Sequence, residues 1–173
     1  LVDPKALRKA HVKADRALAR AGAPRFQAHV FGRRSLLASG AGYPFESGRA
    51  DLWNMELGQT VFTESPTHSR VTAVTFSSDG ELFATASDDG AVRLWRTEDQ
   101  VLVREFGARD HMPHAIAFSP DGERIASGGD DSGPGFGAHG GLVRIWDVAT
   151  GELELTMDLS TMPIRTIDYA PDG

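Results

Sequence analysis

The glycine-rich stretch Gly135-Phe136-Gly137-Ala138-His139-Gly140 has the spacing G-x-G-x-x-G, which in some folds binds a dinucleotide. That chemistry places a pyrophosphate at the N-terminus of a helix that follows a strand, with an acidic residue about 20 positions later. Here the apolar run 142–146 follows the glycines and predicts a strand. Because no helix N-terminus would face a phosphate, the stretch is better interpreted as an insertion loop.

Metal ligands and nucleophiles are the other chemistry that the residues could supply. Asp130-Asp131-Ser132 has glycine-rich flanks, but no glutamate is placed to close a calcium loop. His111, His114 and His139 lack the spacing typical of zinc sites and are interpreted as histidines of turns and strand ends. The serines have no G-x-S-x-G elbow that would activate one of them. The sequence therefore predicts no catalytic residue, no metal site and no cofactor.

The same pattern of residues occurs twice in the chain and begins a third time. Residues 71–95 read VTAVTFSSDGELFATASDDGAVRLW; residues 113–146 repeat them around an interruption, and 164–173 begin again. The Asp-Gly turns and the tryptophans are both spaced by 42 and 51 residues. A repeat of about 40–45 residues in which a tryptophan closes a strand indicates propeller blades. The turns are Asp79-Gly80, Asp121-Gly122 and Asp172-Gly173, and the tryptophans are Trp53, Trp95 and Trp146.

Short apolar runs between these turns predict four strands in each copy. In the best-preserved copy they lie at 71–76, 82–86, 91–95 and 101–106. In the next copy they lie at 113–118, 123–128, 141–146 and 152–157, and 164–169 would be the first strand of a further blade. A decayed copy has a first strand within 25–31 and others at 35–40, 50–53 and 58–63. Runs that are apolar on both faces suit strands sandwiched between neighbouring sheets.

These segments resemble the WD repeats of the β-propeller family, strongly over 68–158 and weakly over 25–63. The resemblance implies an all-β fold, a partial propeller of four-stranded antiparallel blades at about 25–63, 68–106 and 111–157. It also implies that a histidine, a Ser or Thr, an aspartate and the tryptophan hold each blade together by hydrogen bonds, which buried polar groups require. Those structural residues are His68, Thr85, Asp89 and Trp95, then Ser127, Asp131 and Trp146, and finally Ser39 and Trp53. In the middle set, strict spacing puts Asp110 at the histidine position, one residue before His111.

Two connections between the second and third strands are longer than the others, at 41–49 and 129–141. Alternate turns of a meander lie at opposite ends of a sheet, so both insertions are expected on one face of the molecule. Exposed loops with apolar anchors suit a protein or peptide partner, and neutral drift of loop length is the alternative. The candidate partner-binding residues are Tyr43, Phe45, His111, Met112, Phe136 and His139.

Residues 1–24 differ in composition from the rest of the chain. They hold six basic and two acidic residues, a net charge of +4, whereas the remainder holds 12 basic and 22 acidic residues, a net charge of −10. Asp3 can cap a helix that begins at Pro4, and Gly22 can end it, so a helix is predicted over 4–21. We expect a basic helical linker or the tail of an upstream domain. A basic arm for nucleic acid is the alternative, but no aromatic residue accompanies the charges.

Three blades and one strand cannot close a ring, since propellers have about four to eight blades. We therefore expect the remaining blades to come from missing sequence or from another copy. The composition is that of a soluble globular protein, and neither a nucleic-acid nor a membrane partner is predicted. The absence of cysteine leaves the compartment open, with the cytoplasm slightly favoured.

The resemblance implies a non-catalytic scaffold for protein–protein interaction. The alternative is the sensory or docking portion of a larger multidomain enzyme, of kinase or NTPase type, whose catalytic part lies outside this chain.

Overall fold

A computed structural model describes residues 25–31, 36–41, 48–54, 57, 59–64, 69–107, 111–131, 140–160 and 162–173. Within these residues the regular structure is three four-stranded antiparallel sheets, each with its strands in sequence order, which we call the first, second and third blades. The helix predicted over 4–21, in the segment 1–24, lies outside the described residues.

The strands of the first blade are β1 (Arg25–Phe31), β2 (Leu36–Ala41), β3 (Arg49–Asn54) and β4 (Gln59–Glu64). Those of the second are β5 (Val71–Phe76), β6 (Leu82–Ser87), β7 (Ala91–Arg96) and β8 (Leu102–Gly107). Those of the third are β9 (His111–Phe118), β10 (Arg124–Asp131), β11 (Gly141–Asp147) and β12 (Leu153–Ser160).

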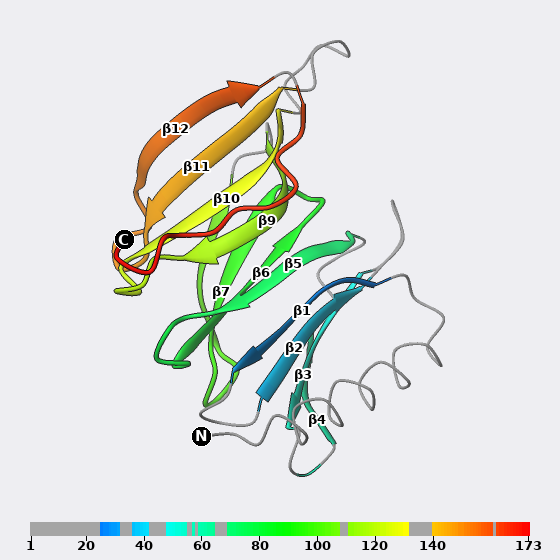
Figure 1. Cartoon of the computed structure of the whole chain (residues 1–173). Helices are drawn as coiled ribbons and strands as arrows, with labels where there is room; N and C mark the ends of the chain where they lie inside the picture. Colours follow the sequence, from blue (N-terminus) through cyan, green and yellow to red (C-terminus); the bar gives the residue numbers. More distant parts are fainter. Residues whose placement is uncertain are drawn as a thin grey trace.

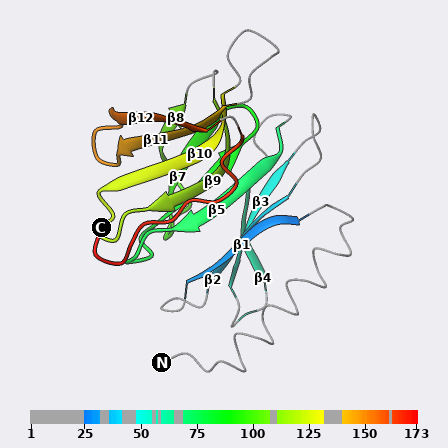
Figure 2. The same ribbon diagram turned by 45° about the horizontal axis from the view of Figure 1, so that its top comes forward.

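The blades stand side by side like parts of a fan, with β1, β5 and β9 as neighbouring inner strands (Figures 1 and 2). One apolar core lies between the first and second blades and includes Leu52, Phe83 and Trp95. A second core lies between the second and third blades and includes Phe106 and Trp146. Each blade therefore buries its apolar faces against its neighbours, as expected for part of a propeller.

The three tryptophans occupy equivalent positions. Trp95 lies opposite Phe83 on the preceding strand, as Trp146 lies opposite Ile125 and Trp53 opposite Leu37. In every blade the pairing of the third strand with the fourth shifts by one residue at the tryptophan. The internal repeat that the sequence predicts is thus confirmed down to the register of its strands.

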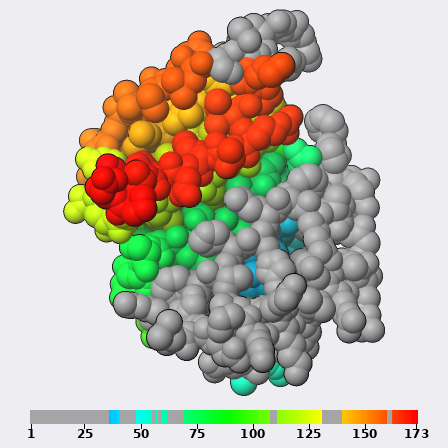
Figure 3. Space-filling view, viewed as in Figure 1, coloured from blue at the N-terminus to red at the C-terminus, as the bar shows by residue number. Residues whose placement is uncertain are grey.

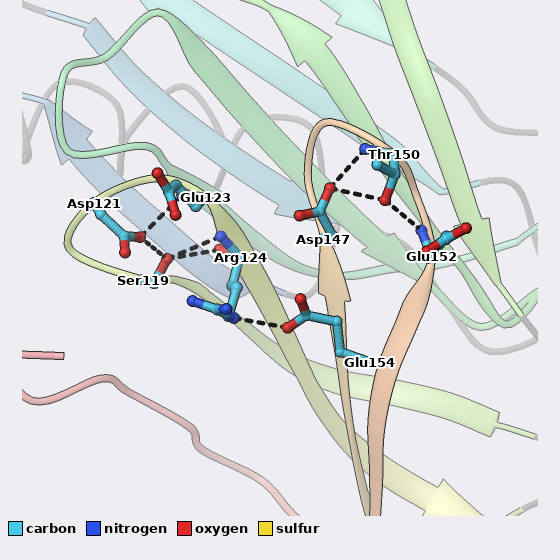
Figure 4. A network of polar contacts seen from close by, with 8 residues as sticks. All are labelled: Ser119, Asp121, Glu123, Arg124, Asp147, Thr150, Glu152 and Glu154. Carbon is cyan, nitrogen blue, oxygen red and sulfur yellow. Dashed lines mark hydrogen bonds and ion pairs between the residues drawn. The ribbon is translucent and has the colours of Figure 1, made fainter.

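The turns at the opposite end from the insertions are held by side chains. In the second blade, Asp79 accepts hydrogen bonds from the Ser77 hydroxyl at 2.6 Å and from the Glu81 N–H at 2.9 Å, and Gly80 follows with φ 73°. Figure 4 shows the same arrangement in the third blade, where Ser119 and the Glu123 N–H bond to Asp121 and hold the pKa of its carboxyl below the usual value.

Two strand predictions need correction. The stretch 129–131, predicted to lie in a loop, extends β10, because Asp130 pairs with Met112 and Asp131 with His111 on β9. The second insertion is therefore shorter than expected and covers residues 132–140.

The segment 164–169, predicted as a strand, forms no ladder with any described strand, since its only backbone bond to one runs from the Ile164 N–H to the Gly129 carbonyl, at 3.2 Å. The segment nevertheless lies along the third blade, in red in Figures 1 and 3.

Candidate interaction surface

Two of the residues expected to hold the second blade together are hydrogen-bonded to each other. The indole Nε1 of Trp95 donates to the Thr85 hydroxyl at 3.2 Å, and the Trp95 ring stacks on Phe83 with centroids 6.2 Å apart. In the first blade, Ser39 Oγ and Trp53 Nε1 are buried and have no hydrogen-bond partner among the described residues. His68 lies outside the described residues.

The expected Asp89 is part of a second network at the turn between β6 and β7. It accepts hydrogen bonds from the Ser87 hydroxyl at 2.6 Å and the Ala91 N–H at 3.0 Å, and pairs with Arg93 at 2.8 Å. Burial alone would raise the pKa of Asp89, but these donors outweigh it and leave the pKa below the usual value.

Arg93 is a residue that the sequence reasoning missed. Its guanidinium also pairs with Glu105 on β8 at 2.9 Å, so one side chain joins the turn to the outer strand. The signal was present in the sequence, since an arginine stands two residues before both Trp95 and Trp146. Arg93 is partly buried, and its counterpart in the third blade, Arg144, is buried.

His111 is not a surface residue, which corrects its expected place among the partner-binding loops. It is 1% exposed, and its Nε2 lies 2.8 Å from the Ser127 hydroxyl inside the third blade. Because β10 extends to Asp131, residue 111 pairs with it and belongs to β9, and its side chain points into the blade. Met112 is also in β9 instead of a loop, but it remains partly exposed. Trp146 is buried, with its ring centroid 5.9 Å from that of Phe106.

We define the insertion-bearing face as the end of the blades where second strands connect to third strands. Its expected aromatic and histidine residues Tyr43, Phe45, Phe136 and His139 lie outside the described residues, as does the side chain of Asp131. The described part of the face includes one ion pair and one histidine–carboxylate contact beside the Asp89 network. The Arg70 guanidinium contacts the Asp88 carboxylate through Nε at 2.9 Å and through Nη2 at 3.1 Å. His114 Nε2 lies 3.1 Å from Asp130 Oδ2.

The polar groups at this end of the blades are partly buried and paired with one another, so they form a support whose charges are largely compensated. Among the described residues no group of three or more His, Cys, Asp or Glu could hold a metal ion. The part of the chain that the structure describes also contains no helix long and apolar enough to cross a membrane.

Comparison with known families agrees with the repeat. The family model described as "WD domain, G-beta repeat" matches residues 58–96 and 101–147. These two matches cover most of the second and third blades and the last strand of the first.

Two curated proteins are similar to parts of this chain. The chain is 32% identical over 143 residues to the pre-rRNA-processing protein crb3/ipi3 of Schizosaccharomyces pombe, a match covering 78% of the chain and 31% of that protein. It is 33% identical over 75 residues to Protein Notchless of Drosophila melanogaster, covering 43% of the chain and 14% of that protein. The chain thus spans less than a third of the length of either relative.

Proposed function

Because this chain belongs to the WD-repeat family, we propose that it is a non-catalytic scaffold that binds a protein or peptide partner through its insertion-bearing face. The observation that carries the proposal is the support beneath the two insertions. His114–Asp130 joins β9 to the end of β10, from which the second insertion leaves, and at the end of the first insertion the Gly48 N–H donates to the Ser69 carbonyl at 3.0 Å. A rigid base under variable loops is how many binding proteins present contact residues.

The experiment compares capture of partners by the chain and by two variants. Tyr43→Ala with Phe136→Ala removes an apolar anchor from each insertion. Leu57→Ala removes an equally apolar side chain, 66% exposed, from the turn between β3 and β4 at the other end of the first blade. We expect the double variant to lose partners that chemical cross-linking and mass spectrometry identify with the unmodified chain, and Leu57→Ala to keep them. Equal capture by all three proteins would remove this face from consideration.

The first relative supplies a more specific expectation about the partner. That protein is named for pre-rRNA processing, which favours a partner from a ribosome-precursor assembly for this chain also. The alternative function, a docking portion of a kinase or NTPase, predicts catalytic motifs in the open reading frame around this sequence. Reading that frame separates the two functions.

A further inference from the structure

The first blade has two faces, and only one of them packs on the second blade. The residues of β2 and β3 that belong to the core shared with the second blade are Leu36, Ala38, Ala50 and Leu52. Side chains alternate along a strand, so the residues between these point to the opposite side. We call that side the outward face of the first blade; its residues on β2 and β3 are Leu37, Ser39, Asp51 and Trp53.

The outward face is buried. Leu37 is 1% exposed, and Ser39 and Asp51 are each 2% exposed. A side chain on the face of a sheet is shielded from solvent in this way when another element packs over it. The third blade shows the contrast, because on its side away from the second blade Ile145 is partly exposed and Leu155 is 45% exposed.

The cover of the outward face comes from a part of the chain beyond the described residues. The described strands that pack on the first blade belong to the second blade and lie on its other side. Within the first blade, the stretches that the structure does not describe are connections of at most six residues. Residues 1–24 are longer and lead directly into β1, so they have the length that covering four strands requires.

The charge on the outward face favours the same segment. The side chain of Asp51 is 1% exposed, and its Oδ2 lies 2.7 Å from both Nε and Nη2 of Arg49. In the second blade the equivalent position is Arg93, so the sign of the charge is reversed here. A buried carboxylate is stabilised by positive charge nearby. Residues 1–24 carry a net charge of +4, against −10 for the remainder of the chain.

The segment also has an apolar side to pack on the sheet. The helix predicted over 4–21 would place small and aliphatic residues along one face, namely Leu7, Ala10, Ala14, Leu18 and Ala21. Such a stripe is marginal as an isolated helix and gains stability from packing on another apolar surface.

We propose that residues 1–24 pack this stripe on the outward face of the first blade, over Leu37 and Ser39, and bring positive charge toward Asp51. The inference is independent of the insertion-bearing face. The segment meets the first blade from the side on which the first blade itself meets the second, where Phe83 and Trp95 face Leu52. While it is docked, it keeps any other element or partner off this face.

Thiol labelling tests the proposal directly, because the chain contains no cysteine and a single introduced one reports on one site. Ser39→Cys places a thiol on the outward face. Ala38→Cys places one on the neighbouring residue, which faces the second blade and is the matched control site. Both are expected to react slowly with iodoacetamide in the whole chain. Adding Leu7→Glu and Leu18→Glu should speed the reaction of Ser39→Cys by about tenfold or more and leave Ala38→Cys unchanged.

A second pair of substitutions controls for charge. Val12→Glu with Arg16→Gln changes the net charge by the same amount on the opposite side of the predicted helix, and is expected to leave the labelling of Ser39→Cys slow. Thr60→Cys on β4, an exposed position, supplies the rate of an uncovered site.

Three outcomes would overturn the proposal. If Leu7→Glu with Leu18→Glu leaves the labelling of Ser39→Cys unchanged, another stretch covers the face, such as the first insertion. If Ser39→Cys reacts as fast as Thr60→Cys without further substitution, the face is open. If Ala38→Cys accelerates as much as Ser39→Cys, the segment supports the whole chain and does not cover this one face.

Discussion

Trp95 on β7 donates its indole N–H to the hydroxyl of Thr85 on β6 at 3.2 Å, and both residues are buried. The first blade has the same two residue positions but not the same bond. There Ser39 and Trp53 are both buried at their polar atoms, and neither atom has a hydrogen-bond partner among the described residues. One repeat has thus kept a polar contact that its neighbour lacks.

We expect Thr85→Val to destabilise the chain by about 1–2 kcal/mol, because valine keeps the shape of threonine and leaves a buried indole N–H unpaired. Ser39→Ala is the matched variant, since it removes a hydroxyl that bonds to no described residue, and its effect is expected within about 0.5 kcal/mol. Urea unfolding followed by tryptophan fluorescence measures both. Equal losses for the two variants would contradict the assigned role of Thr85.

The turn between β11 and β12 supplies a second prediction. Gly151 has φ 80°, and a Cβ atom there would lie 2.7 Å from Nη1 of Arg104 on the second blade. Arg104 donates to the carbonyls of Ala149 and Thr150, at 2.7 and 2.8 Å. Gly151→Ala is therefore expected to cost about 1–2 kcal/mol for the left-handed backbone and more for displacing the guanidinium.

Gly122→Ala separates these two costs. Gly122 has φ 76°, but nothing lies within 4 Å of a Cβ atom there. Thermal unfolding should show the smaller loss for Gly122→Ala. If the two alanine variants lose the same stability, the contacts of Arg104 with this turn contribute little to the stability of the chain.

Asp89 predicts a pH dependence of stability. Its pKa in the folded chain is lowered from the ordinary value of 3.8, so the folded state binds the proton less readily than the unfolded state. The stabilising contribution is therefore fully present above pH 3.8 and is lost as the pH falls below it. Asp89→Asn should lower stability near neutral pH and reduce the further loss of stability as the pH falls below 3.8. Urea midpoints at several pH values test this, and parallel curves for the two proteins would refute it.

Close packing at Gly128 predicts how the C-terminal segment can be released. Gly128→Ala should push Ile164 away, because the added Cβ would lie 2.5 Å from its Cγ2. We expect trypsin to cleave after Arg165 faster in this variant than in the unmodified chain. Adding Ile164→Ala returns the space and should slow cleavage relative to Gly128→Ala alone. An unchanged cleavage rate in Gly128→Ala would show that the segment is not held there.

Much of the architecture was readable from the sequence because its repeats can be compared with one another. Asp79-Gly80 and Asp121-Gly122 mark equivalent turns, and Trp95 and Trp146 mark equivalent strands. A strand predicted in one copy could therefore be compared with its equivalent in the other. The errors fall where that comparison gives no guidance. Gly129-Asp130-Asp131 was predicted to lie in a loop, yet these residues pair with β9 and belong to β10.

The segment 164–169 illustrates a different limit of predicting strands from the sequence. Its sequence is that of an inner strand, but a strand is defined by a neighbour with which it exchanges hydrogen bonds, and composition cannot supply one. The residues that bind a partner are harder still to predict from the sequence. Insertions do not repeat, so Tyr43 and Phe136 have no second copy against which their role can be judged. His111 was misplaced for a related reason, since its burial depends on the length of β10.

The number of residues between paired positions of β10 and β11 has a practical consequence for protein engineering. Ser127 faces Arg144 across β10 and β11 as Thr85 faces Arg93 across β6 and β7, although the first pair is 17 residues apart in the chain and the second only 8. The additional length leaves the paired strands undisturbed. We therefore expect residues 132–140 to tolerate exchange for a foreign epitope, so that grafted peptides could be displayed here on the framework of paired strands.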